Sequence, residues 1–341
     1  MKRTFAVLFI ILLAPLVHAA EPPKPQQGPT LVFATVDEGK RILMARDEFV
    51  RQMSPFDRAI LMKTDKEVTE KDFLAFVGKN VLAWTDADKK KVTAALKGLL
   101  RPLAALDLPF PGKVLLIKST GKEEFGAAYT RANAIILPKA HLNGPVVGLR
   151  RLICHEFFHI LSRKNPKLRN KLYASIGFVK CDEVELPAGL KARRITNPDA
   201  PRNEHCIQVG IGGKKRWAIP ITYSSTKTYD VERGGNLFAY AQFRFLVVER
   251  EAGSSAVKPV LEAQRPKLAH IFGVSGFFEQ VGMNTLYVVH PEEILADNFD
   301  LLVLGGRVVP SPEIIEKMRK ILKEHGKAKR AAPEKARTPR R

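Results

Sequence analysis

Two histidines four residues apart, His155 and His159, have the type and spacing needed to hold a metal ion. On a helix, side chains four positions apart project from the same face about one turn from each other, so their imidazoles can converge on one cation. Glu156 follows the first histidine, where its carboxylate can accept a proton from a water molecule that the metal activates. The pattern predicts a catalytic zinc site with Glu156 as general base. The alternative is two core histidines with ordinary hydrogen-bond partners.

A catalytic zinc ion takes a third protein ligand and leaves a fourth position open for water. One common arrangement has a third histidine six residues after the second, but Asn165 stands at that position. Glu204 and His205 are a second option, although they lie in a segment without a regular pattern to hold them.

The third option is the acidic start of a predicted helix at residues 291–302. Glu293 and Asp297 are one turn apart there, so Glu293 can bind the metal while Asp297 accepts a hydrogen bond from the outer nitrogen of His155. Glu292 competes with Glu293 for the ligand position, but five positions do not bring Glu292 and Asp297 to the same face. The alternative is a solvated acidic helix start that the helix dipole favours.

The string His155-Glu156-Phe157-Phe158-His159, followed far along the chain by Glu293-Ile294-Leu295-Ala296-Asp297, resembles the gluzincin zinc metallopeptidases. The resemblance covers these two helices. It implies an α+β, zincin-like (thermolysin-like) catalytic domain with one catalytic Zn²⁺ that hydrolyses peptide bonds. It also implies an edge strand that pairs with the substrate backbone, which we place at residues 132–137. A hydrogen-bond donor to the oxyanion is also implied, and the candidates are Tyr223, Tyr229, Tyr240 and His290.

The elements that must position these residues follow from periodicity and from proline and glycine positions. Residues 31–106 are largely helical in pattern, and residues 180–225 are irregular. We expect further helices at residues 145–164, 237–248, 291–302 and 311–325, and strands at residues 113–118, 134–137 and 286–289. The resulting organisation is a signal peptide (1–20), a mobile leader (21–30), a helical N-terminal region (31–110), the catalytic domain (111–325) and a basic disordered tail (326–341).

The first twenty residues have the pattern of a secretory signal. Lys2 and Arg3 precede an uncharged apolar run at residues 5–17, and Val17-His18-Ala19 suits signal peptidase. The run is shorter than the roughly 20 residues that span a bilayer, and no later segment is apolar for long enough. We therefore predict a secreted or periplasmic protein without a membrane span after cleavage.

Three cysteines follow the predicted signal, and an oxidising compartment allows one pair among them. We expect Cys181 to pair with Cys206. Cys154 lies next to His155, and a helix does not aim adjacent side chains at one ion, so we expect a small buried apolar residue rather than a thiolate ligand.

The net charge of +21 favours association with anionic material, including an envelope polymer that the basic tail would bind. The tail contains no aromatic residue to stack on a base, so no specific nucleic acid is expected. The predicted partner of the active site is a peptide or protein substrate. Two other functions remain open: a zinc hydrolase of a non-protein amide or ester, and a non-catalytic, zinc-containing envelope-binding protein.

Overall fold

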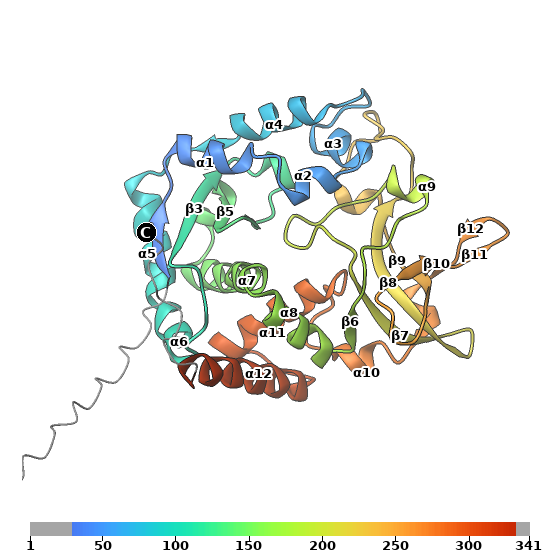
Figure 1. The fold of residues 1–341 in the computed structure, drawn as a ribbon. Coiled ribbons are helices and arrows are strands. Elements are labelled where there is room, and N and C mark those ends of the chain that lie inside the picture. The colour runs from blue at the N-terminus through green and yellow to red at the C-terminus, as the bar shows by residue number, and fades with distance from the viewer. Residues whose placement is uncertain (1–28, 332–341) are drawn as a thin grey trace, which may run out of the picture.

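Residues 29–331 are described by the computed structural model. The predicted signal peptide, most of the predicted leader and the last ten residues of the predicted tail lie outside this range. Figure 1 shows helix α7 near the middle of the molecule, with a first sheet and the N-terminal helices on one side of it and three further helices on the other. A second sheet lies beside these layers.

The first sheet has the strand order β1-β3-β5-β4, with β2 also paired to β3. Strands β1, β3 and β5 are parallel, and β4 runs antiparallel to β5. The strands are β1 (Thr30–Phe33), β2 (Val81–Leu82), β3 (Lys113–Ser119), β4 (Tyr129–Arg131) and β5 (Ala134–Pro138). The predicted strands at residues 113–118 and 134–137 are therefore confirmed. Because β1 pairs with β3, the domain boundary predicted after residue 110 falls inside one sheet.

Both faces of this sheet are covered by helices. Val114 and Leu116 point into a core shared with α5 and α7, whereas Leu115 and Ile117 point into a core shared with α1, α2 and α4. Burial on both faces explains the continuous apolar run in β3. The N-terminal helices are α1 (Val36–Leu43), α2 (Glu48–Gln52), α3 (Pro55–Leu61), α4 (Glu70–Lys79), α5 (Asp86–Lys97) and α6 (Leu100–Ala105).

The edge strand is not where the sequence placed it. Residues 132–137 fall mainly in β5, which lies between β3 and β4, so its backbone is already paired on both sides. The edge is β4, which reaches that position through a two-residue turn at Ala132 and Asn133, with Ala132 at a φ of 50°. Residues 121–131 are rich in glycine, threonine and charged residues, a composition typical of a loop, and do not indicate this three-residue strand.

Helix α7 (Val146–Lys164) packs against α11 (Pro291–Leu304), as the periodicity of both segments predicts. The rings of Phe158 and Phe299 meet between them with centroids 5.6 Å apart. Helices α8 (Pro166–Ser175) and α12 (Pro312–Ala331) pack on the same layer. Helix α12 continues six residues past the predicted end at 325, so the start of the predicted disordered tail is helical.

The second sheet is antiparallel, with the strand order β10-β9-β8-β7-β14, and β6 and β13 add to β7 and β9. Its strands are β6 (Phe178–Lys180), β7 (His205–Ile211), β8 (Lys214–Ser224), β9 (Ala241–Arg250), β10 (Val257–Pro259), β13 (Leu268–Ala269) and β14 (Val274–Ser275). A hairpin of β11 (Leu261–Glu262) and β12 (Arg265–Pro266) lies outside it. Short helices are α9 (Ala188–Lys191), α10 (Phe278–Val281), η1 (Lys122–Glu124), η2 (Lys139–Asn143), η3 (Leu237–Ala239) and η4 (Ile271–Gly273).

Three expectations for this half of the chain are wrong. Residues 237–248 form η3 and most of β9 rather than a helix, because a short apolar run rich in Phe and Val has the same pattern in a buried strand as in a buried helix. Residues 180–225 contain β7 and β8, so the segment is not irregular throughout. Residues 286–289 form no strand.

Cys154, Cys181 and Cys206 are all buried free thiols. Cys181 and Cys206 lie on neighbouring strands, with Cys181 following β6 and Cys206 in β7. A hydrogen bond between their sulfur atoms lowers the pKa of Cys206. Their predicted disulfide stays a prediction. Across residues 29–331, no helix is long and apolar enough to cross a membrane.

Candidate metal centre

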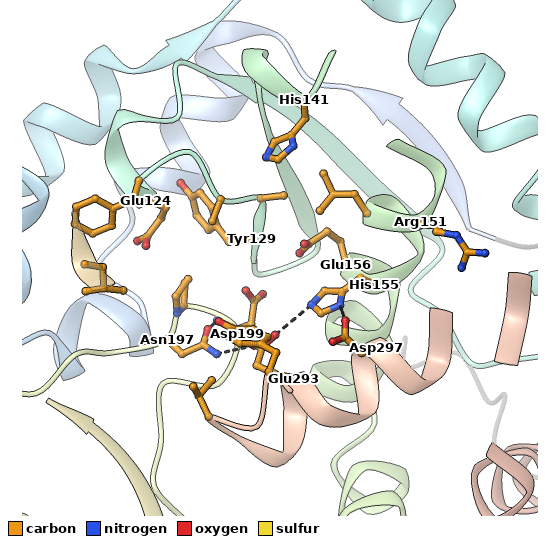
Figure 2. Close-up of a pocket in the computed structure, with 18 of the residues that line it drawn as sticks. Glu124, Tyr129, His141, Arg151, His155, Glu156, Asn197, Asp199, Glu293 and Asp297 are labelled. Atoms are coloured by element: carbon orange, nitrogen blue, oxygen red, sulfur yellow. Dashed lines mark hydrogen bonds and ion pairs between the residues drawn. The ribbon is translucent and has the colours of Figure 1, made fainter. Parts of the chain in front are cut away.

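Helices α7 and α11 bring three predicted ligands to one point. Oε2 of Glu293 lies 3.1 Å from Nε2 of His155 and 3.7 Å from Nε2 of His159. One ligand atom from each of the three residues lies within 4.8 Å of the other two. Figure 2 shows His155 and Glu293 next to each other on the wall of a cavity. Two neutral imidazoles and one carboxylate are a donor set that zinc accepts, with room for a further ligand.

The outer nitrogen of each histidine is held by its own carboxylate from α11. Nδ1 of His155 lies 2.9 Å from Asp297, and Nδ1 of His159 lies 3.0 Å from Glu292. Glu292 is therefore not a competing ligand, because its carboxylate faces the far side of His159. Such contacts fix the orientation of a ligand imidazole and raise its basicity.

These two carboxylates are themselves anchored. Oε2 of Glu292 accepts hydrogen bonds from the hydroxyls of Ser162 (2.7 Å) and Tyr173. Oδ2 of Asp297 accepts one from the hydroxyl of Thr285 at 2.5 Å. Glu292 is 2% exposed at the side chain, whereas Asp297 is 34% exposed. The carboxylate behind His159 is thus more deeply buried than the carboxylate behind His155.

The inner atoms of the site lack the partners that buried polar atoms normally have. Nε2 of His159 and Oε2 of Glu156 are both buried and have no hydrogen-bond partner among the described residues. Leaving one such group unpaired costs about 1–3 kcal/mol. A cation beside His159 and a water molecule beside Glu156 would satisfy them, so the residues present fit a metal ion.

The histidines and carboxylates of the site shift one another's pKa values. Burial acts to lower the pKa of His155, but hydrogen bonds with Asp297 and Glu293 outweigh it and raise the pKa well above the ordinary value. Burial likewise opposes protonation of His159, yet the carboxylates of Asp199 and Glu293 raise its pKa to about 9. The histidines in turn lower the pKa of Glu293 to about 2, against the effect of burial. The site therefore favours positive charge beside its carboxylates, which protons or a metal ion can supply.

Glu156 lies on α7 directly after His155, and its side chain lines the same cavity. It is 2% exposed. Burial and the neighbouring charge of Asp199 raise its pKa to about 8.

A loop that the sequence analysis did not single out completes the centre. Nδ2 of Asn197 donates to Oε1 of Glu293 at 2.6 Å. Asp199 presents a carboxylate oxygen within 4.8 Å of ligand atoms of both Glu156 and His159. Oδ1 of Asp199 accepts from the backbone N–H of Thr130 at 2.8 Å and from its hydroxyl. The Asn-Pro-Asp string at residues 197–199 is a turn signal, and only the fold places it here.

The predicted oxyanion donors lie elsewhere. The hydroxyl of Tyr240 donates to backbone oxygens of the loop that follows Tyr229, and the two rings pack together. Tyr223 stacks under Arg193. His290 caps α11, its Nδ1 accepting from the backbone N–H of Glu292. None of the four lines the cavity.

Tyr287 is a tyrosine that does line the cavity, together with Glu293, and it is 46% exposed. Its loop lies within the strand predicted at residues 286–289, which the structure does not form.

Glu204 and His205, the other proposed ligands, are also outside the centre. Glu204 pairs with Arg169 at 2.9 Å, and Nε2 of His205 lies 3.0 Å from Asn170. Burial lowers the pKa of His205 to about 2.

The cavity in front of the centre has a volume of about 1020 Å³. Its walls come from the segment before β4, the first half of α7, the loop at residues 195–199, the start of β9 and the segment that leads into α11. Much of the wall is apolar, and its apolar side chains include Phe125, Leu152, Ile195, Leu237 and Phe238. A cavity of this size accommodates several residues of a peptide.

No protein-family model matches the chain, and searches of curated proteins and of solved structures found no match.

Proposed function

We propose that the protein is a zinc-dependent peptidase in which His155, His159 and Glu293 bind the metal. The observation that supports this most is a pair of buried atoms without hydrogen-bond partners among residues 29–331: Nε2 of His159, which lies 3.7 Å from Glu293, and Oε2 of Glu156, a residue that lines the cavity. A histidine core without a ligand would leave both atoms unpaired at a cost that proteins generally avoid.

Zinc, when bound, acidifies a coordinated water molecule and polarises a carbonyl oxygen. Glu156 is the base that takes the proton of the attacking water and later delivers it to the leaving amine. Asn197 holds Glu293 through its second carboxylate oxygen. Tyr287 is the hydroxyl on the cavity wall that would donate a hydrogen bond to the developing oxyanion.

Strand β4 offers a substrate less free backbone than the sequence suggested. The outward backbone N–H of Thr130 is bound by Asp199, so that position does not pair with a substrate. Ala128, which directly precedes the strand, lines the cavity. We expect substrate pairing there rather than along residues 132–137.

The test compares zinc content and peptide hydrolysis in four proteins. Wild type should hold about one zinc per chain, whereas His159→Ala should lose it and the activity together. Glu156→Gln should keep zinc and lose hydrolysis by about 100-fold or more, since general-base catalysis contributes 10²–10⁴-fold. His270→Ala is the matched control, because His270 is exposed, caps η4 and does not line the cavity.

Each failure has its own meaning. Stoichiometric zinc without cleavage of any peptide in a broad library would favour a hydrolase of a non-protein amide or ester. An unchanged phenotype in Glu156→Gln would favour a non-catalytic role, with the basic tail binding an anionic envelope polymer. Absence of zinc in protein purified without chelator would refute the metal centre. Export belongs to the same proposal, and a mature N-terminus after Ala19 or Ala20 in the exported protein would support it.

A further inference from the structure

The cavity wall holds a carboxyl group that the metal centre does not use, on a protein whose net charge is +21. Its two arginines, Arg151 and Arg307, both face Asp300, at 2.8 and 4.0 Å. The cations at that end are therefore already paired with a carboxylate. The unused carboxyl group lies at the other end, where Glu124 belongs to η1.

Apart from Glu156, the proposed base, the other carboxylates on the cavity wall have side-chain or backbone partners, whereas that of Glu124 has none among residues 29–331. Glu293 and Asp297 face histidines, and Asp199 is held by Thr130. Among residues 29–331, no side chain or backbone N–H forms a hydrogen bond or ion pair with the Glu124 carboxylate. Figure 2 shows this carboxylate directed toward open space, across the cavity from His155.

The surroundings of Glu124 supply more negative than positive charge. Burial acts first to raise its pKa, and the charges of Glu123 and Asp57 add to this effect. The nearest compensating cation is Arg131, which forms an ion pair with Asp47. A carboxylate in such a place is costly unless a cation joins it.

The walls next to Glu124 are apolar. Phe125 and Ile195 belong to one small apolar cluster with Leu237, and all three line the cavity. Phe238, beside Leu237 in η3, is 82% exposed and lies at the rim. A side chain with an aliphatic stem and a positive end would contact these walls along its stem and place its charge at Glu124.

From this juxtaposition we propose that Glu124 is a specificity residue that selects peptides carrying a lysine or arginine side chain. The proposal rests on the proposed peptidase function for its substrate class. The same carboxylate chemistry would also suit a free peptide N-terminus, so the test separates the two sources of positive charge.

The experiment measures peptide affinity in zinc-loaded protein carrying Glu156→Gln, which allows binding to be read without turnover. The probes are N-acetylated peptides that contain one lysine or, at the same position, norleucine, which keeps the stem and lacks the charge. An ion pair away from bulk water implies a preference of about 10-fold to 100-fold for lysine. Adding Glu124→Gln should abolish the preference, and Glu124→Lys should transfer it to a peptide with glutamate at that position.

Controls keep the result interpretable. Glu313→Gln removes an exposed carboxylate from α12 and should leave the lysine preference unchanged. The ratio of two affinities within one variant does not depend on the fraction of folded protein. Glu124→Gln should also melt no lower than its parent, because the substitution removes no hydrogen bond or ion pair of the Glu124 side chain.

Equal affinity for the lysine and norleucine peptides would overturn the proposal, as would a preference that survives Glu124→Gln. A preference that appears only when the N-terminus is free would overturn the side-chain assignment. If wild type cleaves peptides without this selectivity, the proposed function stands and the specificity proposal fails. If lysine peptides bind at Glu124 but none is cleaved, the binding proposal stands and the proposed peptidase function fails.

Discussion

Removal of the Asp297 carboxylate tests whether the carboxylates behind the histidines set metal affinity. Asp297 is linked to Nδ1 of His155 at 2.9 Å and is anchored by Thr285. A hydrogen bond to a charged group contributes about 1.5–3 kcal/mol, which corresponds to roughly 10-fold to 150-fold in affinity. Because the Asp297 side chain is 34% exposed, solvent screening places the expected loss for Asp297→Ala near the lower end, at about 10-fold.

The amide variant Asp297→Asn refines this estimate. It keeps an acceptor for His155 but loses the charge, and charged hydrogen bonds are about twice as strong as neutral ones. We expect a loss of roughly 5-fold. The corresponding change at the buried carboxylate, Glu292→Gln, should cost more, because no solvent screens it.

The assay is competition for zinc against a chromophoric chelator at pH 7.5, which yields a dissociation constant for each variant. Asp300→Asn is the control, since Asp300 lies on the same helix but pairs with Arg151. Its zinc affinity should stay within about 2-fold of wild type, because a carboxylate tunes metal affinity only when it is hydrogen-bonded to a ligand histidine. Wild-type affinity in Asp297→Ala, or an equal loss in Asp300→Asn, would show that the reasoning about these contacts is wrong.

Three further predictions concern stability. Chelation should lower the melting temperature of wild type and leave that of His159→Ala unchanged, since a ligand that binds the folded state stabilises it. Phe299→Ala should reduce the free energy of unfolding by about 3–5 kcal/mol in denaturant titrations, because Phe299 is fully buried against Phe158. Burial raises the pKa of Asp57 from 3.8 to about 6, so its ionised form destabilises the folded state above pH 6 and this cost is absent below pH 3.8. The free energy of unfolding of wild type relative to Asp57→Asn should therefore rise by about 2 kcal/mol between pH 7 and pH 4, and a difference independent of pH would refute it.

Much of the site-bearing scaffold was predictable because helix periodicity is local. The apolar positions of α7 and the proline at the start of α11 indicate both helices from neighbouring residues alone. Once both are helices, their four-residue spacings place His155 with His159, and Glu293 with Asp297, on common faces.

Strand positions were less predictable because a strand owes its place to partners far along the chain. Nothing local distinguishes the buried run in β9 from a helix, and nothing local shows that residues 129–131 close the edge beyond β5. The edge strand and the helix at 237–248 were accordingly misplaced. The same applies to Asp199 and Tyr287, which lie in loops without a periodic pattern.

By itself, the sequence determined which residue types stand at helical spacing and hence which side chains can share a face. The tertiary structure alone decided how α11 is rotated against α7. That rotation places Glu293 between the two histidines and puts Glu292 behind His159, where Ser162 and Tyr173 hold it. Adjacent residues on a helix point about 100° apart, so only the packing of the two helices settles which of the two carboxylates faces the site and which supports it.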